Sequence, residues 1–253
     1  NSRIKAERIP PAKINKVPNT ATHNQYFQTI EQQHPDHAAT LYIQGQQFEN
    51  ITSDKSRAAY ALLAQVINTP YYQWLRTEKK LGYIVSASPF PQNSVPGLIF
   101  IVQSPTATAV DILAETELFF TDFNDQLLEM SAIEFEEHKQ GLISRLLSKK
   151  KNMGEKMGHF WHNIDVNRLT FDTNESIARE VELLSLSDIQ TLYTNSIIDK
   201  KDPRLLFAHS STLPSADESE DLPNNQSRNQ SQYQPRSKWL ELSTLDKNKL
   251  DSF

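Results

Sequence analysis

Two side chains in the first third of the chain carry groups that could stabilise a reacting carbonyl oxygen, namely Arg76 and Tyr83. A guanidinium and a phenol can both donate hydrogen bonds to a carbonyl or to the oxyanion that forms from it. Arg76 is expected in the last turns of a helix and Tyr83 at the start of a strand, so that a tight turn brings them together. The alternative without chemistry is a structural pair, in which Arg76 bridges to Glu78 or another carboxylate and Tyr83 is half-buried.

The elements that would position this pair are a helix, a tight turn and a β-hairpin. Thr69 is predicted to cap the helix, with Pro70 at its first position, where a missing N–H costs nothing. Gly82 is predicted to end it as a residue in the left-handed conformation. β-Prone runs at residues 83–88 and 98–102, on either side of a turn-forming segment, then make the two strands of the hairpin.

Two pairs of histidines have the spacing H-x-x-H, but neither predicts a metal site. Pro35 lies inside the first pair, His34 and His37, so a polar loop that leads into an edge strand is the simpler interpretation. His159 and His162 are flanked by aromatic residues and are expected on a helix that packs against the sheet. The chain contains no H-x-x-E-H motif, in which a glutamate next to the second histidine serves as general base.

Composition narrows the class of protein. The 253 residues carry a net charge of -5 with a pI near 5.8, which argues against a nucleic-acid partner. No apolar run approaches the roughly 20 residues that cross a bilayer, so no membrane partner is predicted. The absence of cysteine excludes disulfides and thiol chemistry. Because the chain begins at Asn1 without an initiator methionine, we expect it to be a fragment of a longer polypeptide.

The predicted elements run in the order strand, helix, strand, strand, several helices and a final strand. Helices segregated from a largely antiparallel sheet make an α+β fold. A mean hydropathy of -0.57 is low for one compact domain, so part of the chain is expected to be a solvated tail. The predicted segments are a linker or arm at 1–33, an α+β domain at 34–210, a polar and disordered segment at 211–236, and a C-terminal tail at 237–253.

The stretch RTEKKLGYIVSAS, followed by GLIFIVQSP, resembles the C-terminal half of the pitrilysin/insulysin family of inverzincin metallopeptidases, and in particular its bacterial pitrilysin-like branch. In that family an arginine and a tyrosine seven positions apart, within R-T-E-x-x-L-G-Y, contact the substrate carbonyl at a zinc ion held by the other half of the molecule. Arg76 and Tyr83 match those two positions. The resemblance extends from about residue 34 to residue 210.

The resemblance implies the last domain of a clamshell peptidase, built from a largely antiparallel sheet packed against several helices. It implies a non-catalytic domain of a zinc endopeptidase that degrades peptides, in which Arg76 and Tyr83 bind substrate and stabilise the oxyanion. The zinc ion would be held by the N-terminal catalytic half of the same polypeptide, so the fragment alone is predicted to bind no metal and to be inactive. The resemblance also implies a periplasmic location, with the cytoplasm as the alternative.

Two other functions stay compatible with the sequence. The chain could be a catalytically dead relative that acts as a peptide-binding or scaffold module, since the edge strand of such a sheet can accept an extended peptide. It could also be an α+β domain of unrelated function, because a fold does not imply an activity. An H-x-x-E-H motif with a distal glutamate in the preceding part of the polypeptide would favour the peptidase.

Overall fold

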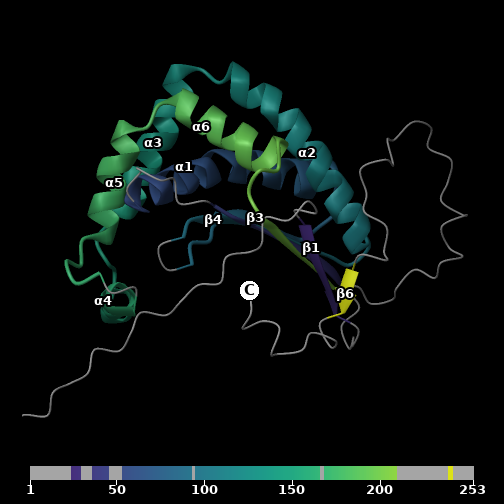
Figure 1. The fold of residues 1–253 in the computed structure, drawn as a ribbon, viewed down its shortest axis with the longest axis horizontal. Helices are drawn as coiled ribbons and strands as arrows, with labels where there is room; N and C mark the ends of the chain where they lie inside the picture. The colour runs from purple at the N-terminus through teal and green to yellow at the C-terminus, as the bar shows by residue number, and fades with distance from the viewer. Residues whose placement is uncertain are drawn as a thin grey trace, which may run out of the picture.

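An open sheet covered on one face by helices forms the body of the protein (Figure 1). The computed structural model describes residues 24–29, 36–45, 53–92, 95–165, 168–209 and 239–241. Within these residues the sheet has six strands in the order β3-β4-β2-β5-β1-β6. The strands are β1 (Asn24–Thr29), β2 (His37–Gln44), β3 (Ile84–Pro89), β4 (Gly97–Ser104), β5 (Arg204–His209) and β6 (Trp239–Glu241).

The pairing of the strands confirms an α+β fold with a largely antiparallel sheet. β3, β4, β2 and β5 pair antiparallel, and β1 and β6 extend the sheet by parallel pairing. β1 lies within the predicted arm and β6 within the predicted tail. The polar segment 211–236 lies outside the described residues, so the predicted segment boundaries stay predictions.

The strand that follows the first histidine pair is not an edge strand, contrary to the prediction. β2 begins at His37 and lies between β4 and β5, while His34 lies outside the described residues. The reason is tertiary: β5 comes from a distant part of the chain and covers the side of β2 that the hairpin leaves open.

The helices follow local capping and periodicity. Thr108 and Asp111 form a capping box at the start of α2, and the Ser131 side chain accepts a hydrogen bond from the Glu134 N–H at the start of α3. The helices are α1 (Ser53–Tyr72), α2 (Ala109–Glu129), α3 (Ala132–Leu146), α4 (Met153–Asp165), α5 (Thr173–Leu183) and α6 (Leu186–Tyr193), with π-helical segments η1 (Gln73–Glu78) and η2 (Thr194–Ile198).

The core lies between the helices and one face of the sheet. Leu98, Phe100 and Val102 of β4 alternate toward the helices and are almost fully buried, whereas Ile99 and Ile101 point to the other face and are only half-buried. Aromatic rings fill the space below α2: the rings of Phe100 and Phe120 meet edge to face at 5.0 Å. The helices shown in Figure 1 therefore leave the second face of the sheet open.

A buried cation joins the last strand of the antiparallel unit to the helices. Arg204, 1% exposed, donates hydrogen bonds to the carbonyl oxygens of Ser196 at 3.0 Å and Ile197 at 2.5 Å. Its Nη1 also lies 3.3 Å from Oε1 of Glu117 on α2. A cation at the carboxyl end of η2 meets the partial negative charge of the helix terminus.

Replacing this cation should destabilise the fold. Arg204→Met leaves a carboxylate and two carbonyls without their buried partner, and we expect the free energy of unfolding to fall by about 3–5 kcal/mol in urea titrations. The matched control is Arg179→Met, because Arg179 is exposed and lies 3.8 Å from Asp172, an ion pair worth about 1 kcal/mol or less. Equal losses for the two variants would contradict the structural role of Arg204.

Candidate functional site

Contrary to the prediction, the helix that carries Arg76 does not begin at Thr69. α1 starts at Ser53 and runs through Pro70, then continues without a break as η1. The apolar stripe of Ile67, Tyr71 and Leu75 crosses this point and is at most 1% exposed. Burial of that stripe outweighs the hydrogen bond that proline cannot donate, because tertiary packing supplies most of a helix's stability.

The helix ends two residues earlier than predicted. Lys80, with a φ of 56°, is the left-handed residue, and the Leu81 N–H donates to the Leu75 carbonyl at 2.9 Å. Gly82 has no positive φ, and its role is steric. A Cβ on Gly82 would lie 2.8 Å from Cγ1 of Val102 and 3.0 Å from a backbone oxygen of β4. Glycine is needed because the turn crosses β4 at close range.

This turn brings Arg76 and Tyr83 together, as the spacing predicts. The Arg76 Nη1 donates to the carbonyl oxygen of Gly82 at 3.1 Å, one residue before Tyr83. Arg76 is exposed, and Tyr83 is 43% exposed. A guanidinium has five N–H donors, so the hydrogen bond to Gly82 leaves other N–H groups of Arg76 that can bind an acceptor.

Asp36, just ahead of β2, is the residue of this site that the sequence analysis missed. The Tyr83 hydroxyl donates to Oδ2 of Asp36 at 2.5 Å, and Nε2 of Gln103 donates to the same oxygen at 2.9 Å. Asp36 is only 9% exposed. The signal in the sequence was weak: an aspartate immediately before a strand, 47 positions from its tyrosine partner.

The contact with Asp36 sets the protonation of Tyr83. The hydrogen bond to the carboxylate, together with its negative charge, raises the pKa of the phenol because both favour the protonated form. The Tyr83 phenol therefore stays protonated to a higher pH than a free phenol, and its hydrogen points at Asp36. Donation of that hydrogen to any other acceptor requires the phenol to leave Asp36.

The second histidine pair lies away from this site. His159 and His162 are on α4, as expected, but α4 does not pack against the sheet, and His162 is exposed. In the described part of the chain, no three histidine, cysteine, aspartate or glutamate side chains come together in a way that could hold a metal ion. The residues described here thus do not fit a zinc site.

No helix among the described residues is both long and apolar enough to cross a membrane.

Comparisons with known proteins agree with the fold. Residues 62–161 match the family model of PQQ synthase PqqF-like, C-terminal lobe domain 4. The chain is 28% identical over 145 residues to a nardilysin-like protein of Arabidopsis thaliana, and 30% identical over 132 residues to the insulin-degrading enzyme of Homo sapiens. These alignments cover 57% and 52% of this chain but only 14% and 13% of the relatives, so the chain spans a small part of their length.

Two solved structures share the fold. The crystal structure of pitrilysin superposes with a TM-score of 0.68 at 22% identity, covering 76% of this chain and 20% of that one. The peptidase M16 inactive domain from Pseudomonas fluorescens superposes with a TM-score of 0.57 at 15% identity, covering 80% of this chain and 46% of that one.

Removing the charge of Asp36 should lower the pKa of Tyr83. In Asp36→Asn we expect the phenol to titrate closer to its ordinary value of about 10, because the anion that disfavours the phenolate is gone. The raised pKa also means that this contact stabilises the fold below about pH 10 and that the gain is lost as the pH rises through the pKa of the folded state. NMR titration of the tyrosine ring carbons measures the pKa. Asp125→Asn, on the exposed side of α2, is the control and should leave it unchanged.

Filling the space at Gly82 should cost stability. Gly82→Ala places a methyl group against Val102 and the β4 backbone, and we expect a loss of about 1–3 kcal/mol in the free energy of unfolding. The matched control is Gly158→Ala on α4, where no atom lies within 4 Å of the added Cβ. There alanine should be neutral or stabilising by up to about 1 kcal/mol. A neutral Gly82→Ala would refute the steric role.

Proposed function

We propose that this chain, a homologue of the pitrilysin/insulysin metallopeptidases that corresponds to a domain of their C-terminal lobe, completes the active site of a zinc endopeptidase. In this proposal Arg76 and Tyr83 bind the substrate carbonyl and stabilise its oxyanion. The observation that carries it is the turn in which the exposed Arg76 guanidinium binds the carbonyl of Gly82, the residue just before the exposed Tyr83. The zinc ion would be held by the N-terminal half of the same polypeptide. There it would polarise the scissile carbonyl and activate the water that attacks it.

The position of the pair on the sheet supports a role in peptide binding. Gln103 points to the open face of the sheet, like Ile99 and Ile101, and holds Asp36, which in turn holds the Tyr83 hydroxyl. The two donors therefore border the face that none of the described helices covers.

Apolar side chains spread over the same open face. Ile84 is 45% exposed and Phe207 is 37% exposed, and Ile101 lies opposite Thr40 in the neighbouring strand. An extended peptide that lies across this face could bury its apolar side chains there while its carbonyl group reaches the donors. The substrate class that fits is therefore an unfolded peptide rather than a small charged metabolite.

The edge strand β3 offers few backbone donors, which argues against the alternative in which this chain binds a peptide as an added strand. The Phe90 N–H donates to Gly97 at 2.8 Å, and since donors alternate along a strand, the N–H of Ala87 points away from β4. That N–H is already bound by Oδ1 of Asn68 at 3.1 Å, and Pro89, two positions on, has no N–H. An incoming strand would find few donors at this edge.

The periplasmic location and the inactivity of the isolated chain belong to the same proposal. Within the described ranges this chain has no group of side chains that could hold a metal ion, and hence no general base next to one. Peptide cleavage would therefore require the N-terminal half, which makes that half the expected partner of this chain.

Mixing this chain with its separately produced N-terminal half and zinc tests the proposal. Cleavage of a quenched fluorescent peptide is expected only in the mixture. Arg76→Ala and Tyr83→Phe should each lower kcat/KM by ~10²–10³, the usual loss when one oxyanion donor is removed. Tyr72→Phe is the matched control, since Tyr72 is 44% exposed on the same helix and should leave kcat/KM unchanged.

Two results would contradict the proposal in different ways. Unchanged kinetics in both Arg76→Ala and Tyr83→Phe, with circular dichroism like that of the parent, would remove these residues from the site. A mixture in which both halves are folded and associated but no peptide is cleaved would favour the scaffold.

A further inference from the structure

Helix α4 turns an apolar face toward solvent. Met153, Met157 and Trp161 recur every four residues and are 72%, 63% and 69% exposed. Phe160 and Ile164 lie on the same side and are 41% and 47% exposed. Together they form a stripe about 100° wide, the width that a helix normally buries against its core. We call these five residues the α4 face.

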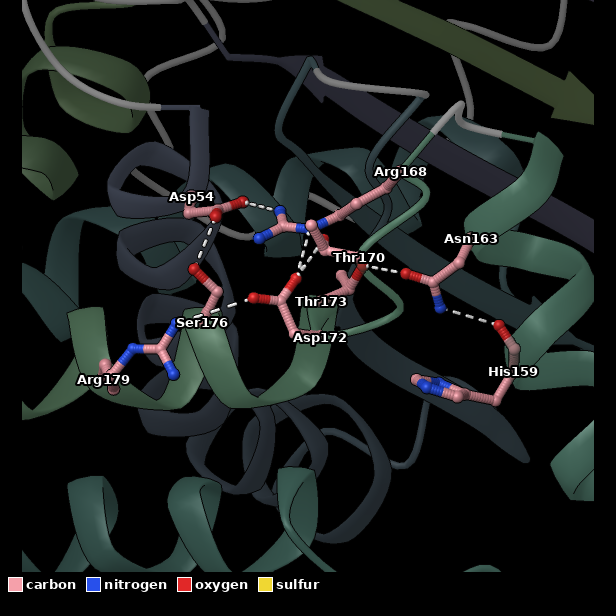
Figure 2. A network of polar contacts seen from close by, with 9 residues as sticks. All are labelled: Asp54, His159, Asn163, Arg168, Thr170, Asp172, Thr173, Ser176 and Arg179. Carbon is pink, nitrogen blue, oxygen red and sulfur yellow. Dashed lines mark hydrogen bonds and ion pairs between the residues drawn. The ribbon is translucent and has the colours of Figure 1, made fainter.

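The flank of α4 beside Phe160 is anchored through Asn163, which is fully buried. Its Nδ2 donates to the His159 carbonyl at 2.8 Å, and its Oδ1 accepts a hydrogen bond from the Thr173 hydroxyl at the start of α5 (Figure 2). The Arg168 N–H donates to the Asn163 carbonyl at 2.7 Å. Of these bonds, the one from Thr173 joins this flank of α4 to α5.

An ion-pair network holds the segment after α4 against two other helices. The Arg168 guanidinium contacts Asp54 of α1 at 2.6 Å and Asp172 at 3.1 Å, and the Ser176 hydroxyl donates to Asp54 at 2.7 Å (Figure 2). Burial raises the pKa of the Asp54 carboxyl, but the hydrogen bonds from Arg168 and Ser176 outweigh it and bring the pKa below its ordinary value. Asp54 therefore stays charged and holds Arg168 against α1. At the edge of the α4 face the Phe160 ring meets the Phe171 ring edge to face at 5.6 Å, whereas Met153, Met157 and Trp161 remain exposed.

The α4 face has the character of a protein interface. It contains no charged residue, and exposed apolar patches of several hundred Å² usually mark a binding surface. The neighbouring polar positions carry both signs, Glu155 and Lys156, whereas helices that lie on anionic membranes have a predominantly basic polar side. Figure 1 shows α4 next to α5 at one end of the helical layer. Arg168, just after α4, contacts Asp54 at the start of the 20-residue helix α1, whereas Arg76 follows the other end of that helix, so this surface is distinct from the site at Arg76 and Tyr83.

The lengths of related proteins indicate what covers this face. The matching family model is the fourth domain of a lobe, and the relatives named above are several times longer than the matched region. In the solved inactive domain, the unit that resembles this chain takes up 46% of the chain, which leaves room for about one further unit of similar size. Domain interfaces within one chain bury roughly 600–1,500 Å², and the α4 face could form the apolar centre of one.

We infer that the α4 face is the surface on which the adjoining domain of the C-terminal lobe packs. The occupant is an apolar face of that domain within the same polypeptide. This inference rests on the homology with lobed peptidases and not on the roles proposed for Arg76 and Tyr83.

The reactivity of a thiol placed on the α4 face tests this inference. The chain has no cysteine, so Met157→Cys introduces a single thiol. Its rate of modification by a maleimide is measured in this chain alone and in the full polypeptide that contains the adjoining domain, in a background without other cysteines. We expect at least a tenfold slower reaction in the full polypeptide. His162→Cys, on the opposite and exposed side of α4, is the control and should react equally fast in both.

Three results would overturn the inference. Equal rates for Met157→Cys in the two proteins would mean that the adjoining domain does not cover the face. Protection that grows with the concentration of this chain alone would assign the face to a second copy. Protection by vesicles of anionic phospholipid, without the domain, would assign it to a membrane. Because Arg76→Ala and Tyr83→Phe should not alter these rates, a failure here is distinguishable from a failure of the proposed activity.

Discussion

The structure depends above all on the burial of one helical stripe against the sheet. Ile67, Tyr71 and Leu75 carry α1 past a proline and into η1 without leaving the core. Because these side chains must stay in contact with the sheet, the helix ends only where Lys80 turns the chain back. The position of Arg76 on η1 is thus a consequence of core packing several residues earlier in the same helix.

The second constraint is a short polar contact on the open face of the sheet. Asp36 accepts hydrogen bonds from both Tyr83 and Gln103, which join the start of β2 to the hairpin. The same carboxylate that positions the phenol also occupies its only hydrogen. In the function we propose, a substrate oxyanion would have to compete with Asp36 for that hydrogen, so binding of the peptide and release of the phenol would be coupled.

Two surfaces of the domain differ in composition. The open face of the sheet carries half-buried apolar side chains, and in the function we propose it binds an extended peptide whose carbonyl reaches Arg76 and Tyr83. The α4 face lies elsewhere and offers apolar side chains without charges. The ion pairs of Arg168 with Asp54 and Asp172 hold the segment after α4 against α1 and the start of α5.

The sequence by itself determined the hairpin, the presence of a helix before it and the proximity of Arg76 to Tyr83, because periodicity and a separation of seven residues are local properties. Only the tertiary structure decided which strands flank β2, why Gly82 must be small and that Asp36 reaches Tyr83. Those features depend on contacts between residues far apart in the chain, such as the 47 positions between Asp36 and Tyr83. The same holds for α4: the sequence predicts a helix that packs against the sheet, and only the structure shows that its apolar side chains Met157 and Trp161 are exposed.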